Sequence, residues 1–400
     1  MGNEGKLEFI PSEILNQENR QLYEKFVGQG TVIHELWGRH YHKVLKYINE
    51  PIIVLTGPSH VGKTTVLKKL YETVTSNFES EMAEDPGMIP AIYVEAKSPE
   101  KDFRWLELHL QILQALNEPE EFLGKKLGPV NQKIENKNPL FPSKLDKNLR
   151  HAVEIALNQR KTHVLFIDEA QHLGRLTSDR KLAHQMDYIK SLVNRTNITI
   201  VLAGSYELAE FMNQSAQLSN RSTHVHFHRY RFGVDSEMQE FANIIGTFQK
   251  LLPVDEVPDL TYEWEYFASH TAGCAGILKK WFNRALKECL YESCIKKERA
   301  VITLEHFRKT QLTTNQILKI ANDALTGEQK FAEDERRRNL IFEMFTNDDT
   351  LLETDISPTS IPSIHKSDEQ QQVQKRKKTK PGQRKPTRDI VGDIKNAQSL

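Results

Sequence analysis

The sequence predicts an α/β fold, in which a parallel β-sheet with flanking helices is followed by a smaller helical domain and a largely disordered tail. Three observations support this prediction. Short apolar runs alternate with helical segments between residues 49 and 235, such runs then stop, and apolar residues become scarce after residue 325. Strands that alternate with helices need crossover connections, which produce parallel sheets covered on both faces.

The first observation defines an α/β domain over residues 49–235. Four apolar runs in it are typical of strands buried in a parallel sheet, and a fifth, 225–227, is a weaker candidate. The four runs are 52–55, 91–94, 164–167 and 198–203. Helical spacing predicts helices at 66–74, 103–116, 149–157 and 186–193. Residues 117–148 are rich in Pro, Asn, Lys and Gly, which indicates a loop or an insertion.

The flanking regions are predicted to be helical or disordered. Residues 1–48 form an N-terminal extension with helical spacing over 32–47. Residues 236–325 form the helical domain, with helices at 236–252, 261–270, 277–291 and 304–325. Residues 326–400 are poor in apolar and rich in charged side chains, which is typical of disorder. Within this tail, segment 366–388 is strongly basic, with nine basic and two acidic residues.

Composition excludes several classes of protein. The chain of 400 residues has a formal net charge of zero, so the overall charge names no partner. Its three cysteines have no ligand-type spacing, which argues against a disulfide framework or a zinc ribbon and favours a reducing cytosol. No apolar run approaches the roughly 20 residues that span a bilayer. We therefore expect a cytoplasmic protein without a membrane partner.

A phosphate-binding pattern follows the first predicted strand. Gly57, Pro58, Ser59, His60, Val61, Gly62, Lys63 and Thr64 fit GxxxxGK[ST] between a strand and a helix. Backbone N–H groups of such a loop surround phosphate oxygens, and the start of the helix adds a favourable dipole. Lys63 is expected to reach the β- and γ-phosphates of ATP, Thr64 is expected to bind Mg²⁺, and Thr65 completes the nucleotide-binding set.

A second pattern ends the third predicted strand. Val164-Leu165-Phe166-Ile167 leads into Asp168 and Glu169, which is a Walker B arrangement. Asp168 is expected beside the Mg²⁺ ion, and Glu169 is expected to polarise the water that attacks the γ-phosphate. A buried strand capped by an acidic turn is the alternative, and the position of the pattern about one hundred residues after the P-loop favours the catalytic interpretation.

Several segments resemble a specific family. Asp187 to Asn194, Val201 to Leu208, Gln217 to Ser222 and His226 to Tyr230 resemble the TnsC/TniB group of AAA+ transposition regulators from Tn7-like elements, related more distantly to MuB and IstB. The most specific part is the QLSxR segment followed by HFHRY. The resemblance, over roughly residues 30–310, implies an AAA+ ATPase with a helical lid.

The resemblance also implies roles for individual residues. Ser205 occupies the position of a polar sensor, and Arg221 that of an arginine finger completing a neighbouring subunit's site. The turn 271–276 matches the start of the second-sensor helix, where many relatives have an arginine and this chain has Lys279 and Lys280 a turn later. The neighbourhood of Lys97, Lys101 and Arg104 supplies DNA-backbone contacts in related regulators, and a solvated loop is an equal alternative.

For partners, the resemblance implies a ring or helical filament on double-stranded DNA in bacterial cells. It further implies contacts to transposase subunits and to a target-selection protein of the TniQ or TnsD type, with the tail as the leading candidate for transposase contact. Two alternatives remain open: another P-loop switch of the origin-recognition or signalling type, and a non-hydrolysing DNA scaffold. His224, His226 and His228 alternate along a predicted strand, and we favour a polar strand face over a zinc site.

Overall fold

The computed structural model describes residues 15–28, 34–99, 103–117, 144–175, 179–213 and 221–346. Residues Met1–Leu340 make up one compact unit, and Ile341–Leu400 make up a second. Among the described residues, no helix is both long and apolar enough to cross a membrane.

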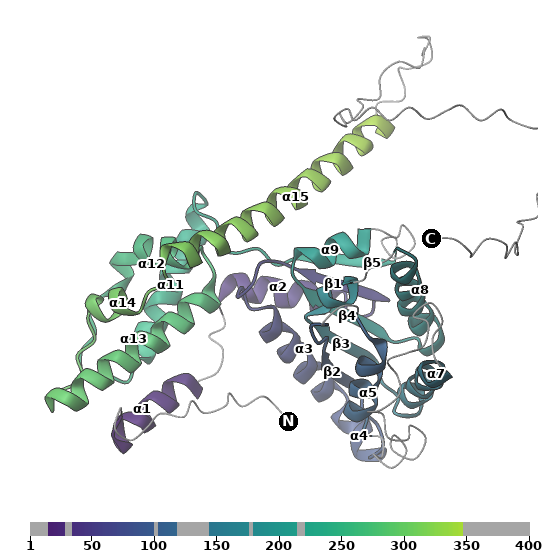
Figure 1. The fold of residues 1–400 in the computed structure, drawn as a ribbon, viewed down its shortest axis with the longest axis horizontal. Coiled ribbons are helices and arrows are strands. Elements are labelled where there is room, and N and C mark those ends of the chain that lie inside the picture. Colours follow the sequence, from purple (N-terminus) through teal and green to yellow (C-terminus); the bar gives the residue numbers. More distant parts are fainter. Residues whose placement is uncertain are drawn as a thin grey trace, which may run out of the picture. The chain divides into compact units, whose positions relative to one another are not determined.

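A parallel sheet of five strands organises the first part of the chain, as predicted (Figure 1). Its order is β2-β3-β4-β1-β5, and every neighbouring pair is parallel. The strands are β1 (Ile52–Thr56), β2 (Ala91–Glu95), β3 (Val164–Asp168), β4 (Thr199–Gly204) and β5 (Ser222–His226). Since parallel strands end at the same edge, the P-loop after β1 and the acidic pair at the end of β3 lie along one edge.

Strand β5 begins three residues earlier than the predicted run 225–227. It lies at the end of the sheet, and only one of its five side chains is fully buried. An edge strand tolerates polar side chains such as Ser222, Thr223 and His224, which an apolar-run criterion does not detect.

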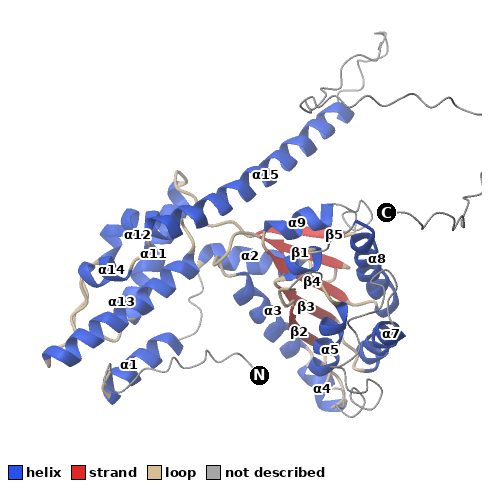
Figure 2. Ribbon diagram, in the orientation of Figure 1, coloured by secondary structure: helices blue, strands red, loops and turns tan. Residues whose placement is uncertain are grey.

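Helices cover both faces of the sheet, as Figure 2 shows. One face packs against α5 (Trp105–Ala115), α7 (Lys144–Gln159), α8 (Asp179–Thr196) and α9 (Tyr206–Asn213) in a large apolar cluster. The other face packs against α2 (Glu35–Lys46) and α3 (Lys63–Asn77). Two short elements complete this region, α4 (Glu79–Glu84) and the 3₁₀ helix η1 (Ala170–Gly174).

A separate apolar cluster holds the helical part together. Its elements are α1 (Gln17–Gly28), α11 (Asp235–Leu251), η2 (Leu260–Glu263), α12 (Trp264–Thr271), α13 (Ala275–Lys296) and α14 (Leu304–Thr310). At its centre, Trp281 packs against Phe267 and Phe307 and donates from its indole nitrogen to the carbonyl of Phe307 at 2.9 Å. The aromatic rings thus join three helices, and the indole N–H finds a partner inside the core.

The predicted helix 304–325 is wrong in one respect, because it is two helices. α14 ends at Thr310, and α15 (Thr314–Thr346) starts after a short break. The backbone N–H of Thr313 donates to Oε1 of Gln316 at 3.0 Å, and the N–H of Gln316 lies 3.4 Å from the hydroxyl of Thr313. This reciprocal pair is a capping box that starts a new helix.

The expected start of the disordered tail at residue 326 also needs correction. α15 continues to Thr346, and residues 347–400, with the basic segment 366–388, lie outside the described residues. The stretch after residue 326 is charged, but Glu, Lys, Arg and Ala favour helix strongly. Low apolar content was therefore not sufficient evidence of disorder here.

Candidate functional site

The P-loop lies between β1 and α3, as predicted, and its two glycines are required for different reasons. A Cβ atom at Gly57 would lie 2.0 Å from the backbone oxygen of Phe227, so no side chain fits there. Gly62 has φ of +113°, a conformation that other residues rarely adopt. The loop therefore passes close to the chain after β5 and then turns into the first residue of α3, Lys63.

Lys63 points back across this loop. Its ammonium donates to the carbonyls of Gly57 at 2.9 Å and Pro58 at 2.7 Å. Burial lowers its pKa to about 8, against the opposing attraction of Glu169 and Asp168. The site thus holds a cation with few countercharges in contact, an environment that favours the approach of an anion such as phosphate.

Asp168, at the end of β3, accepts two hydroxyl hydrogen bonds on one oxygen. Thr64 donates to its Oδ2 at 2.7 Å, and Tyr93 from β2 donates to the same oxygen at 2.8 Å. Burial and the neighbouring carboxylate raise the pKa of Tyr93, so the phenol keeps its proton and acts as a donor. The predicted pair of Thr64 and Asp168 is therefore brought together and oriented by a third residue.

The residues at this point suit a magnesium ion. Mg²⁺ prefers oxygen ligands and usually combines one or two protein groups with phosphate oxygens and waters. The hydroxyl of Thr64 and the carboxylate of Asp168 are such oxygens, side by side at the carboxyl edge of the sheet. Elsewhere in the described ranges, no group of three or more His, Cys, Asp or Glu side chains is placed to hold a metal.

Glu169 follows Asp168 with φ of +52° and ψ of +32°, a left-handed conformation that is uncommon outside glycine. Its backbone N–H donates to Oδ1 of Asp168 at 2.9 Å. Its side chain accepts a hydrogen bond from Gln171 at 2.6 Å. The turn therefore aims the two acidic side chains in different directions from adjacent positions.

The helical part contacts the P-loop directly. The N–H of Gly276, in the first turn of α13, donates to the carbonyl of His60 at 2.9 Å. The ammonium of Lys280, on the same helix, lies 3.4 Å from Nδ1 of His60. Burial, Lys280 and Lys63 lower the pKa of His60. Of the two candidate lid lysines, Lys280 is the one whose ammonium lies against the P-loop residue His60.

Arg221 lies at the amino end of the strands, opposite the carboxyl end that carries the P-loop. It precedes β5, whose first residue pairs with Ile52 at the start of β1, so Arg221 is separated from its own P-loop by the length of the strand. The side chain is exposed and donates to Oδ1 of Asn194 at 2.7 Å. It therefore does not belong to the phosphate site of its own chain.

The remaining sequence candidates fall in three groups. Ser59 is exposed and Val61 is buried within the loop, and Thr65 follows Thr64 in α3. The N–H of Ser205, after β4, donates to Gln171 at 3.1 Å. Lys97 and Arg104 are exposed near the carboxyl end of β2, whereas Lys101 lies outside the described residues.

Sequence reasoning missed two residues of the site, Tyr93 and Gln171. Tyr93 is the only hydroxyl-bearing side chain in β2, and it pairs in register with Phe166 two residues before Asp168. Gln171 is a buried polar residue two positions after Glu169. Each had a weak signal, a polar group in or beside an apolar strand, but its partner depends on which strands are neighbours.

The three alternating histidines have separate partners. His224 lies 3.0 Å from the hydroxyl of Ser222, and His226 lies 2.9 Å from the hydroxyl of Tyr206. His228 bonds the carbonyl of Arg229 at 2.9 Å. Burial lowers the pKa of His226 to about 4, which keeps the ring neutral near pH 7. These bonds account for the polar strand face that we favoured over a zinc site.

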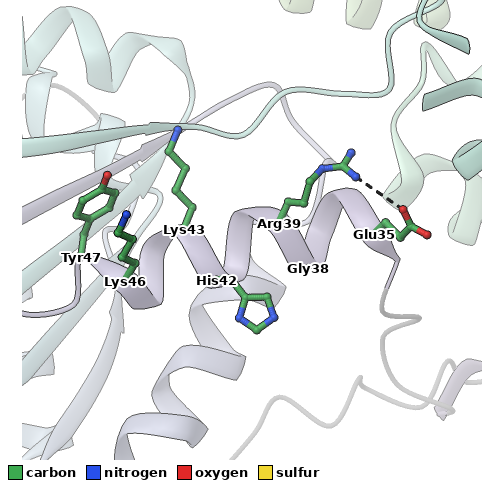
Figure 3. Close-up of a pocket in the computed structure, with 7 residues that line it drawn as sticks. All are labelled: Glu35, Gly38, Arg39, His42, Lys43, Lys46 and Tyr47. Atoms are coloured by element: carbon green, nitrogen blue, oxygen red, sulfur yellow. Dashed lines mark ion pairs between the residues drawn. The ribbon is translucent and has the colours of Figure 1, made fainter. Parts of the chain in front are cut away.

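A basic hollow of about 840 Å³ runs along α2 (Figure 3). Its lining comes from this single helix and the residue after it: Glu35, Gly38, Arg39, His42, Lys43, Lys46 and Tyr47. Figure 3 shows Arg39 turned toward Glu35, and Arg39 also makes a two-pronged ion pair with Glu240 at 2.7 and 3.0 Å. Small-molecule sites are mostly apolar with a few convergent polar groups, which this exposed helix face does not provide.

Comparison with known proteins identifies the domain. Residues 48–212 match the family model described as an AAA domain. No curated protein matches the chain. Among solved structures, it is similar to a Walker-type ATPase of Pyrococcus abyssi, with 18% identity, a TM-score of 0.41 and coverage of 76% of each chain.

Two further solved structures are similar at the same level. Cdc6p from Pyrobaculum aerophilum has 14% identity and a TM-score of 0.45, over 72% of this chain and 69% of that chain. Domain III of the Thermotoga maritima replication initiation protein DnaA has 15% identity and a TM-score of 0.37, over 74% and 96%. Identities and TM-scores this low say nothing about substrates or partners.

The architecture and the family match agree. Four of the five strands of the parallel sheet, the P-loop between β1 and α3, and the acidic pair at the end of β3 lie within the matched residues. Residues 48–212 therefore form an AAA domain with the P-loop fold of the AAA+ ATPases.

Proposed function

We propose that this protein is an ATPase that hydrolyses ATP to ADP and phosphate with the help of Mg²⁺. The observation that carries the proposal is the convergence of Lys63, Thr64, Asp168 and Glu169 at one edge of the sheet. Lys63 and the loop N–H groups hold the β- and γ-phosphates, while Thr64 and Asp168 hold the ion. Bound Mg²⁺ would neutralise charge on the phosphates.

Glu169 orients the attacking water in this proposal. The water oxygen attacks the γ-phosphorus, the bond to the oxygen shared with the β-phosphate breaks, and ADP leaves. Such reactions depend on positioning and charge stabilisation and need no covalent intermediate. The carboxylate has a second oxygen, Oε1, to which no described residue donates, so it is open to the water proton.

Arg221 is proposed to complete the site of a neighbouring copy. An exposed arginine on the edge opposite the P-loop can reach outward, and a guanidinium stays charged and pairs with phosphate oxygens in a fork. Hydrolysis would then require a homo-oligomer, in the form of a ring or a helical filament. Lys280 is proposed to act as the lid cation that responds to the γ-phosphate.

The biological role that we propose is regulation of DNA transposition in the bacterial cytoplasm. Support comes from the resemblance to the TnsC/TniB group, above all QLSxR and HFHRY. Phe227, the centre of the second segment, donates from its N–H to the carbonyl of Thr56 at 2.7 Å and borders Gly57. The HFHRY segment of the resemblance thus lies directly behind the P-loop.

In this role, the ATP-bound oligomer binds double-stranded DNA and links a target-selection protein of the TniQ or TnsD type to transposase subunits. Lys97 and Arg104 are exposed near the carboxyl end of β2 and form no ion pair with a described residue, so both are free to contact DNA phosphates. Phosphate contacts make binding strongly salt-dependent and nearly independent of sequence.

The test is binding of full-length protein to random-sequence duplex DNA without nucleotide, with ADP and with a non-hydrolysable ATP analogue. We expect binding only with the analogue, as ordered oligomers visible by electron microscopy. A variant with Lys97→Ala and Arg104→Ala should weaken binding and reduce its salt dependence. Absence of DNA binding in every nucleotide state would remove the transposition role and leave an ATPase with other partners.

A further inference from the structure

Gln171 connects two neighbouring strand ends at the phosphate edge. It follows Glu169 by two residues in η1, and its Nε2 donates to Oε2 of Glu169 at 2.6 Å. Its Oε1 accepts from the backbone N–H of Ser205, the residue after β4, at 3.1 Å. The residue is only 9% exposed. One buried carboxamide therefore joins the acidic turn after β3 to the turn after β4.

The two partners fix which way the amide faces. A backbone N–H can only donate, so the group facing Ser205 must be the carbonyl oxygen. A carboxylate can only accept, so the group facing Glu169 must be the NH₂. Rotating the amide by half a turn would place two donors together at one end and two acceptors at the other. Gln171 therefore has a single favourable orientation.

The space around the amide is also restricted. A Cβ atom on Gly204 would lie 2.5 Å from Oε1 of Gln171 and 3.0 Å from its backbone nitrogen. Residue 204 is glycine, so the end of β4 can approach Gln171 this closely. Close packing limits the movement of the amide, and through it the movement of Glu169.

We propose that Gln171 is the positioning residue of Glu169, an inference that rests on the proposed ATP hydrolysis. By holding Oε2, Gln171 fixes the plane of the carboxylate and leaves Oε1 free to accept a proton from the attacking water. The bond to Ser205 sets this position relative to β4, so a shift of the β4 turn moves the carboxylate. Gln171 does not touch the substrate and acts only through Glu169.

The first variant is Gln171→Ala, which removes both hydrogen bonds. Misplacement of a reacting group by about 1 Å costs on the order of 100-fold in rate, so we expect kcat to fall 10- to 100-fold with KM for ATP nearly unchanged. In the Glu169→Gln background, where no carboxylate remains to be positioned, adding Gln171→Ala should leave the small residual turnover, measured at high enzyme concentration, unchanged. An equal further loss in that background would overturn the proposal.

The second variant separates positioning from a structural role. Gln171→Glu keeps the acceptor for the N–H of Ser205 but loses the donor to Glu169 at neutral pH. We expect Gln171→Glu to lose kcat at least as strongly as Gln171→Ala, with KM for ATP nearly unchanged, because the bond to Ser205 alone does not position Glu169. Wild-type kcat in Gln171→Glu would contradict positioning.

Two controls keep the outcomes distinct. Each variant should bind the ATP analogue with wild-type affinity and unfold at a similar temperature, which shows that the fold and the nucleotide site are intact. If wild-type protein shows no turnover on DNA, the proposed hydrolysis fails, and this inference fails with it. If wild type turns over and Gln171→Ala does so equally well, only the role of Gln171 is refuted.

Discussion

The two ends of β5 carry arginines in opposite environments. Arg221, before the strand, is exposed and donates a hydrogen bond to Oδ1 of Asn194. Arg229, after the strand, is about 90% buried and makes a two-pronged ion pair with Glu328 of α15 at 2.9 and 3.1 Å. It also donates to the carbonyl of Ala272, in the turn before α13, at 3.1 Å.

This difference implies different roles for the two arginine side chains. An arginine whose donors are already used inside the chain contributes to the fold, whereas one with exposed donors is available to another molecule. Arg229 joins the end of β5, the turn before α13 and helix α15. Arg221, within the described part of the chain, makes one exposed hydrogen bond, to Asn194. Both belong to segments that carry the family resemblance, so the sequence alone did not separate their functions.

The largest effect on activity is expected from substitution of Arg221, before β5. Arg221→Ala should lower ATP turnover of the DNA-bound assembly by about 1000-fold, because an arginine finger stabilises charge in the transition state. The loss should be measured by phosphate release at saturating ATP. Mixing Arg221→Ala with Glu169→Gln should restore part of the activity, since an intact site can form between the two variants. No recovery on mixing would mean that Arg221 does not act across an interface.

The next largest effect, on stability, is expected from substitution of the buried Arg229, after β5. Arg229→Ala should lower the free energy of unfolding by about 3 kcal/mol, because Glu328 is left partly buried without its partner. Urea denaturation followed by circular dichroism measures this change. The matched control is Arg221→Ala, which should change stability by no more than about 0.5 kcal/mol. Equal destabilisation by the two variants would show that Arg229 and Arg221 do not differ in their contribution to stability.

Lys63 is a third cation that can be compared with Arg221 and Arg229. It is enclosed by the P-loop, and its ammonium donates to backbone carbonyls rather than to a carboxylate. Its pKa is lowered to about 8 by burial, and bound phosphates should raise it. Below about pH 8, Lys63 is protonated in both the free and the ATP-bound protein, so the affinity for ATP should be constant. Above about pH 8, Lys63 of the free protein loses its proton, and ATP binding must be accompanied by uptake of a proton. The affinity should therefore fall by up to about tenfold per pH unit.

Fluorescence titration with an ATP analogue across this range measures the effect. Lys63→Arg is the control, because arginine stays protonated throughout and its affinity should show no such fall. Parallel curves for the two proteins would show that Lys63 does not titrate in the free site.

Much of the site could be predicted because its chemistry is local in sequence. Gly57 to Thr64 form one loop, and Asp168 and Glu169 end one strand, so their spacing alone indicated the arrangement. Tyr93 and Gln171 could not be assigned this way. Their roles depend on β2 lying beside β3 and on β3 lying beside β4, which are long-range pairings.

The helical part shows the same limit. The capping residues Thr313 and Gln316 were visible in the sequence and would have divided the predicted helix 304–325. The ion pair between Arg229 and Glu328 joins residues 99 positions apart, and no local pattern points to it. Contacts of this kind also hold α15 in place beyond residue 325, where composition alone had suggested disorder.

The measurement that tests the central claim most directly is steady-state phosphate release with ATP and Mg²⁺ in the presence of duplex DNA, for wild type and Glu169→Gln. We expect turnover by wild type and its loss in Glu169→Gln, with binding of the ATP analogue retained by both. Equal turnover by the two proteins would show that Glu169 does not orient the attacking water. No turnover by wild type, despite nucleotide binding, would make the protein a nucleotide-dependent scaffold rather than an ATPase.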